Sequence, residues 1–201
     1  MPEKKRVERF RTFVAIKLPD QLKKELAKIQ RFLAEGTDTL KFIKPDQLHI
    51  TLAFLGKISR PAQEEVVAIC QSIGQQVSSF SVYPTHLGAF PRMNRPSLVW
   101  IGLGGDTEEL TKLSDLLSRT LSRRGILPIR GSGGFVPHIS LARVGRKQRR
   151  HQMAPLRDLL ENTKIELSDF AIPVREIVVY QSNLYHPGPE HVPIKTIPLN
   201  S

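Results

Sequence analysis

The sequence predicts an α+β fold built from two similar lobes in a single domain of residues 1–201. The octet HITLAFLG at 49–56 is nearly repeated as HISLARVG at 138–145. Around each octet the same order of strand, helix, octet strand, helix and strand recurs, over approximately 10–90 and 97–184. We expect the two interleaved lobes to be related by a pseudo-two-fold axis, each with an antiparallel sheet and outer helices, and a cleft between them.

In the first half, a β-rich run predicts a strand at 11–19. Apolar residues at helical spacing then predict a helix at 20–36. After the octet strand, Ser59 is suited to cap a second helix at 59–77. Residues 80–90 are rich in β-formers and predict a further extended segment.

The second half restarts the same order. A strand is expected at 97–105 and a long helix at 106–125, before the second octet strand. A short helix is predicted at 152–162, and extended segments at 168–184 and 192–200. No linker is long enough to let the lobes separate, so we expect one body.

Composition narrows the class of protein. The formal net charge is +11 and the isoelectric point is about 10.1, which favours a polyanionic partner such as nucleic acid. The single cysteine, Cys70, excludes an internal disulfide and indicates a reducing cytoplasm. No apolar run approaches the roughly 18 residues of a membrane span, so no membrane partner is expected. We also expect a monomer.

Each octet offers an imidazole and a hydroxyl side by side. Because side chains alternate along a strand, His49 and Thr51 share one face, as do His138 and Ser140. A pseudo-two-fold axis would bring the two pairs together across one cleft. Two histidines suit displacement at phosphorus, where a base takes a proton from the entering oxygen and an acid gives one to the leaving oxygen.

The hydroxyl groups complete this chemistry, because they can donate to the phosphate oxygens on which charge builds up. A metal site is the competing interpretation. A zinc site wants three or four ligands, yet the two motifs contain no cysteine or carboxylate, and no HExxH or CxxC motif occurs. We therefore expect neither a metal nor another cofactor.

The chain resembles the two-histidine (2H) phosphoesterase superfamily, which is defined by two HxTx or HxSx motifs. Within it, the chain is similar to the RNA 2′,3′-cyclic phosphodiesterases once named 2′–5′ RNA ligases. The resemblance covers nearly the whole chain and rests on segments in the family's order: RTFVAIKLP, LHITLAFLG, LGAFPRMNRPSLVWIGL, FVPHISLARV and EIVVYQSNL. It implies the bilobal 2H fold, metal-independent hydrolysis of a terminal 2′,3′-cyclic phosphate on RNA to a 2′-phosphate, and a weak, reversible 2′–5′ joining activity.

By motif, the resemblance makes His49 the proton donor and His138 the proton acceptor. Spacing alone does not assign these roles, and the symmetry of the lobes allows them to be exchanged. Thr51 and Ser140 would hold the phosphate. Close relatives more often carry threonine where this chain has Ser140, but the hydroxyl is retained.

Phe54 and Arg143 occupy matching places, five residues after each histidine. The resemblance places Phe54 near a base and Arg143 on a phosphate. Strict alternation instead puts both on the apolar face, where Phe54 would be a core residue and Arg143 a costly buried charge. We expect a bulge or the strand's end to turn Arg143 into the cleft, while both interpretations of Phe54 stay open.

Three alternatives remain. The protein could be a 2′–5′ RNA ligase, an esterase for a small cyclic nucleotide, or a non-catalytic RNA-binding module. The basic segment 143–151 favours RNA with a cyclic phosphate end over a mononucleotide. Several other rings are interpreted as surface or packing residues: His86, His151, His186, His191, Trp100 and Tyr180.

Overall fold

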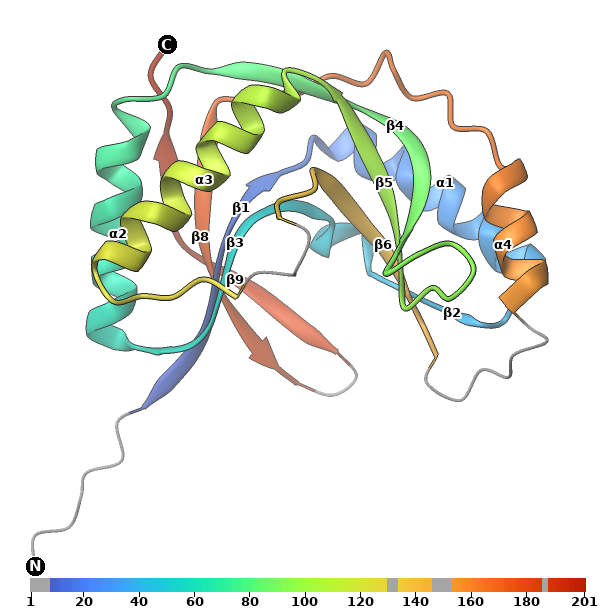
Figure 1. Cartoon of the computed structure of the whole chain (residues 1–201), viewed down its shortest axis with the longest axis horizontal. Helices are drawn as coiled ribbons and strands as arrows, with labels where there is room; N and C mark the ends of the chain where they lie inside the picture. Colours follow the sequence, from blue (N-terminus) through green and yellow to red (C-terminus); the bar gives the residue numbers. More distant parts are fainter. Residues whose placement is uncertain (1–7, 130–133, 146–152, 186–187) are drawn as a thin grey trace, which may run out of the picture.

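A computed structural model describes residues 8–129, 134–145, 153–185 and 188–201 of the chain. In these ranges the chain forms four α-helices and one curled, nine-stranded antiparallel sheet, which confirms the predicted α+β class. Figure 1 shows the elements in two groups, with β3 and β6 between them.

The first half follows the predicted order closely. Its elements are β1 (Arg9–Lys17), α1 (Asp20–Gly36), β2 (Leu40–Phe42), the 3-10 helix η1 (Pro45–Gln47), β3 (His49–Ser59), α2 (Arg60–Gly74) and β4 (Phe80–Phe90). Ser59 caps α2 as expected, since its hydroxyl accepts a hydrogen bond from the backbone N–H of Ala62 at 3.4 Å.

The second half has the same order of strand, helix, octet strand and helix, and then ends in three strands. Its elements are β5 (Leu98–Gly105), α3 (Thr107–Arg123), β6 (His138–Val144), α4 (Met153–Asn162), β7 (Ile172–Val174), β8 (Glu176–Leu184) and β9 (Pro189–Pro198). The extended segment predicted at 168–184 divides into β7 and β8. It divides because β7 pairs with β4, whereas β8 pairs with β1 in the other half of the sheet.

The strand order is symmetric about the centre of the sheet. It runs β7-β4-β5-β6-β3-β1-β8-β9, with β2 added on β6. The two octet strands meet in the middle through the pair Ile50 and Ile139. The last strands of the halves are exchanged: β4 pairs with β5 of the second half, and β8 pairs with β1 of the first. The lobes in space therefore mix elements from both halves.

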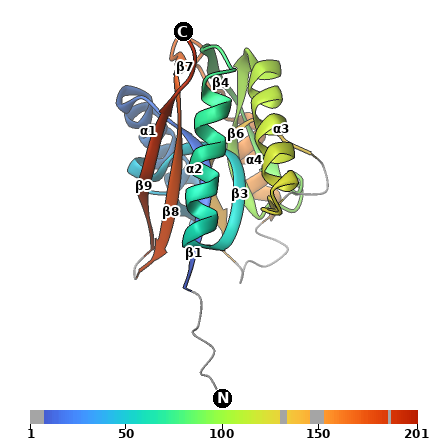
Figure 2. The same ribbon diagram turned by 90° about the vertical axis from the view of Figure 1, so that its left-hand side faces the viewer.

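The helices are exchanged in the same way. Helix α2 contacts α3, and α1 contacts α4, so each helix pair combines the two halves of the chain. Figure 2 shows α2 in front of β8, β1 and β3, with α3 beside it. The helices bury one face of the sheet, and their apolar side chains form one continuous core with it.

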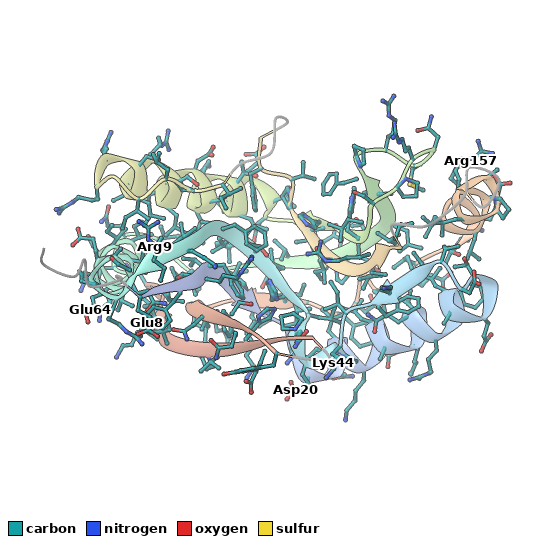
Figure 3. The ribbon with its side chains drawn as sticks, turned by 90° about the horizontal axis from the view of Figure 1, so that it is seen from below. Glu8, Arg9, Asp20, Lys44, Glu64 and Arg157 are labelled. Carbon is teal, nitrogen blue, oxygen red and sulfur yellow. The ribbon has the colours of Figure 1, made fainter. Side chains whose placement is uncertain are left out.

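Cys70 belongs to this core and is fully buried. Burial raises the pKa of its thiol to about 12, because a thiolate is poorly solvated there. The thiol is therefore a packing residue, as expected from the sequence. Among the charged residues labelled in Figure 3, Glu64 and Arg9 lie at one end of the view from below and Arg157 lies at the other.

Candidate functional site

The two octets bring their polar residues onto one shared face of the sheet. The antiparallel pair Ile50–Ile139 places His49 opposite Ser140, and Thr51 opposite His138. All four side chains are half-buried, while the isoleucines between them are fully buried on the other face. We call the face with the histidines the motif face. The grouping predicted from the repeated octets is thus present.

A β-bulge in β3 returns Phe54 to the motif face. In the pairing of β3 with β1, Thr51 pairs with Ala15 and Ala53 pairs with Val14. Leu52 lies between them without a partner in β1 and is the extra residue of the bulge. Leu52 and Ala53 are consequently both buried, and the side chain of Phe54 is 50% exposed. The core interpretation of Phe54 is wrong, because strict alternation fails at this bulge.

The same bulge recurs at the same place in β6. In the pairing of β6 with β5, Ser140 pairs with Trp100 and Ala142 pairs with Val99, so Leu141 between them is the extra residue. Arg143 is exposed beyond it, and the changed alternation puts its side chain on the motif face. The expected bulge is therefore observed, and in both octets it falls at the leucine of a Leu-Ala pair.

Both bulges are fixed by a buried polar side chain from a helix. The Ser114 hydroxyl of α3 donates to the Leu52 carbonyl at 2.8 Å. The Gln30 amide of α1 donates to the Leu141 carbonyl at 3.0 Å. Sequence reasoning missed these two residues. In the sequence, each of them stands out as a polar residue among the apolar positions of its helix. A polar side chain that is buried there needs a hydrogen-bond partner.

The two imidazoles are held in matching tautomers. Nδ1 of His49 lies 2.6 Å from the Gln47 carbonyl, and Nδ1 of His138 lies 2.7 Å from the Val136 carbonyl. A carbonyl oxygen only accepts, so each Nδ1 carries the hydrogen. The Nε2 atom of each ring is left to exchange a proton with a bound group.

Aromatic rings surround His49. Phe13 stacks on it with 4.9 Å between centroids, and Tyr180 stacks on Phe13 at 5.1 Å. His191 approaches the His49 ring edge-on at 5.5 Å. Sequence reasoning gave Tyr180 and His191 surface or packing roles, whereas the structure brings both to the site. Only the pairing of their strands with β1 and with each other places these two residues at the site, and a single sequence does not reveal this pairing.

His138 has a different set of neighbours. Phe90 meets its ring edge-on at 5.2 Å, and Trp100 lies at 6.1 Å. His86 in turn contacts Trp100 at 5.6 Å. The two halves of the site are thus alike in their polar groups and unlike in the rings around them.

Burial sets the protonation of the histidines. The pKa of His49 is lowered to about 4, chiefly by burial and to a smaller extent by the neighbouring His191 and His138, against the opposing effect of its hydrogen bond to Gln47. Burial also lowers the pKa of His138, against the opposing effect of its hydrogen bond to Val136. Both rings are therefore neutral at pH 7 before a ligand binds.

A basic pair lies beside this quartet of polar residues. Arg143 pairs across the strands with Lys41 of β2, and both are exposed. Of the basic segment 143–151, residues 146–151 lie outside the described residues, as do His151 and His186. Within the described ranges, no group of three or more potential metal ligands is found, and no helix is long and apolar enough to cross a membrane.

Comparison with known proteins identifies the family. The family model of LigT-like phosphoesterases matches residues 16–100 and 103–191, and the chain belongs to this family. The resemblance to the 2H phosphoesterases is therefore confirmed.

Individual relatives match over most of their length. An RNA 2′,3′-cyclic phosphodiesterase of Aeropyrum pernix is 34% identical over 82% of this chain and 89% of the relative. One of Aquifex aeolicus is 31% identical over 74% of this chain and 76% of the relative. The crystal structure of TT0787 from Thermus thermophilus superposes with a TM-score of 0.76 over 95% of this chain and 98% of that one, at 21% identity, and so shares the fold.

Proposed function

We propose that the protein is an RNA 2′,3′-cyclic phosphodiesterase that opens a terminal cyclic phosphate to a 2′-phosphate by paired-histidine catalysis. One observation carries the proposal: two His-hydroxyl pairs share the motif face about a single strand pair, with each histidine opposite a hydroxyl of the other octet. The names of the relatives support the same reaction.

The free Nε2 atom of each histidine can exchange a proton with the substrate, and the two roles are those that the resemblance assigns. His138, as proton acceptor, takes the proton of an attacking water. His49, as proton donor, gives a proton to the departing 3′-oxygen. Because His49 is neutral before binding, it must gain its proton when the phosphate anion arrives. An adjacent negative charge raises the pKa of a histidine. The bound phosphate therefore favours the protonated form of His49 that acid catalysis requires.

The hydroxyls of Thr51 and Ser140 donate to the non-bridging oxygens, where negative charge grows in the transition state. Phe54 is available to stack on the terminal base, and Arg143 to contact a phosphate, since both are exposed on the motif face. Lys41 adds a second cation beside Arg143 for an RNA strand. We propose that no metal takes part.

The test uses a short RNA that ends in a 2′,3′-cyclic phosphate, with excess EDTA. Wild type is compared with His49→Ala and His138→Ala, and the position of the product phosphate is determined. We expect wild type to form the 2′-phosphate and each variant to lose at least about 100-fold in rate. Activity that needs a metal, a 3′-phosphate product, or unchanged variants would overturn the proposal. RNA binding without ring opening would favour the binding-module alternative.

A further inference from the structure

A line of exposed side chains continues the motif face away from His49. Beyond the bulge in β3, Phe54 pairs with Phe13 of β1, and Lys57 pairs with Arg11. Alternate residues of β1 share a face, so Arg11 lies on the same face as Phe13. Both Arg11 and Lys57 are exposed. The motif face therefore runs from the octet histidine, past Phe54, to two cations.

An apolar step lies between the histidine and these cations. The backbone N–H of Ile129, in the segment after α3, donates to the Phe54 carbonyl at 2.7 Å in a β-bridge. Gly56, two residues further along β3, has a φ of 66°, and a Cβ built there would lie 3.0 Å from Ile129. Ile129 is thus seated beside Phe54, yet its side chain is 66% exposed. The two side chains together offer bases an apolar surface.

The two cations face one another without a counter-ion. Like charges directly opposite each other in adjacent strands destabilise a sheet. In the part of the chain that the structure describes, neither Arg11 nor Lys57 has an ion-pair partner. Their strands therefore present two unneutralised positive charges at one place, which attracts a polyanion.

The spacing of the two phosphate-binding places fits a nucleic-acid strand. Ala15 pairs with Thr51 and lies about 13 Å along β1 from Arg11, at about 3.3 Å per residue. A phosphate at Thr51 and one at Arg11 are thus separated by roughly two to four nucleotides. Arg9, the next residue of β1 on this face, lies at the same end of the molecule as Glu64 (Figure 3), so we end the line of side chains at Arg11.

We propose that Phe54, Ile129, Lys57 and Arg11 form a track, which we call the upstream track, for the nucleotides that precede the cyclic phosphate end. The inference rests on the proposed function, in which the last base stacks on Phe54. The base before it contacts Ile129, and the preceding phosphates reach Lys57 and Arg11. Sites for single-stranded nucleic acid combine the same two features, surfaces for the bases and cations for the backbone. The protein thereby favours an RNA end over a cyclic mononucleotide.

The test removes the two cations and compares a long with a short substrate. The double variant Arg11→Gln/Lys57→Gln should fold at least as stably as wild type, because it relieves the repulsion between like charges, and thermal unfolding checks this. The double variant Lys24→Gln/Arg31→Gln makes the same change in charge at two exposed positions of α1 and is the matched control.

Binding is followed by the fluorescence anisotropy of a 5′-labelled pentaribonucleotide that ends in a 2′-phosphate and is therefore not turned over. Hydrolysis is measured on the same pentaribonucleotide with a cyclic phosphate end, and on a 2′,3′-cyclic mononucleotide.

We expect Arg11→Gln/Lys57→Gln to bind the pentaribonucleotide about ten-fold more weakly than wild type at low salt. The slope of log affinity against log salt should be shallower by about 1.4, because two phosphate contacts to a single strand are lost. Its kcat/KM on the mononucleotide should equal that of wild type, since this substrate has no upstream phosphate. The control should match wild type throughout. Ile129→Ser should weaken pentaribonucleotide binding without a change of slope.

Equal binding by the two double variants would overturn the upstream track. Equal losses on the mononucleotide and the pentaribonucleotide would also overturn it, because the effect would then lie at the histidines. A slope that changes in Lys41→Gln but not in Arg11→Gln/Lys57→Gln would place the RNA over β2 and β6 instead. If wild type opens no cyclic phosphate, the proposed function fails, whereas the anisotropy result still decides for or against the track.

Discussion

The imidazole of His49 lies against the ring of Phe13, with centroids 4.9 Å apart and planes inclined by 27°. Phe13 is only 3% exposed, and it also stacks on Tyr180. This packing keeps water from one side of the proposed proton donor. It therefore contributes to the burial that lowers the pKa of His49 to about 4.

Removal of the Phe13 ring should raise that pKa. In Phe13→Ala, water reaches the imidazole, and the His49 pKa is expected to move toward its ordinary value of 6.5. NMR titration of the imidazole protons measures the shift. Phe13→Leu is the control, since it keeps an apolar cover and should keep the low pKa. A folded Phe13→Ala protein with an unchanged His49 pKa would show that Phe13 does not set it.

The pH dependence of kcat/KM should be bell-shaped and displaced to acid pH. This parameter reports the free enzyme, in which both histidines have lowered pKa values. A histidine with a lowered pKa loses its proton at a lower pH. The midpoints of both limbs of the profile should therefore lie below pH 6.5, with the midpoint of the acid limb near pH 4, the pKa of His49. The profile of kcat should lie at higher pH, because bound phosphate raises both values. A flat kcat/KM profile from about pH 4 to 8 would be incompatible with paired acid–base catalysis.

The hydrogen bond from Ser114 to the Leu52 carbonyl should matter for activity as well as for stability. Ser114→Ala leaves a buried carbonyl without this partner, at a cost of about 1–3 kcal/mol in the free energy of unfolding. Because the bulge places Thr51 and Phe54, we expect kcat to fall as well. Ser118→Ala is the matched control, as Ser118 is buried one turn later on α3.

Urea unfolding and steady-state kinetics separate the two effects. A Ser114→Ala protein that is less stable but has wild-type kcat and KM would reduce Ser114 to a structural residue. A loss of kcat confined to Ser114→Ala identifies it as a positioning residue.

The hydroxyl group of Ser140 should be required, whereas the additional methyl group of a threonine at this position should not matter. Ser140→Ala removes a donor to the phosphate and is expected to lower kcat by about 10²–10³-fold. Ser140→Thr restores the hydroxyl in the form present at Thr51 of the other octet, and should remain within about three-fold of wild type. Single-turnover rates measure both variants. Equal activity of the alanine and threonine variants would exclude the donor role.

The sequence predicted the helices, the strand order along each half and the four polar residues of the octets, because periodicity and the repeat are local signals. It predicted interleaved lobes but not which strands are exchanged, β4 and β8, since pairing depends on contacts far apart in the chain. Strict alternation failed at Leu52 and Leu141, where carbonyls bind side chains from helices.

The aromatic surroundings of the histidines were missed for the same reason. Tyr180 reaches His49 only because β8 pairs with β1, and His191 only because β9 pairs with β8. Neither residue belongs to a motif that its own segment reveals. The roles assigned to His49, His138, Phe54 and Arg143 remain predictions, as do the single-domain assignment and the monomeric, cytoplasmic state.

The central claim, that His49 gives a proton and His138 takes one, is tested most directly by a change of leaving group. A 3′-deoxynucleoside 2′-phosphate esterified with 4-nitrophenol has no 3′-hydroxyl to attack in place of water, and it needs no acid because nitrophenolate leaves without a proton. Rates of His49→Ala and His138→Ala on this ester and on the cyclic-phosphate RNA are compared with wild type. The account predicts that His49→Ala recovers most of its activity on the ester, while His138→Ala stays impaired on both substrates. Recovery of His138→Ala instead, or equal losses on both substrates in both variants, would contradict the assignment.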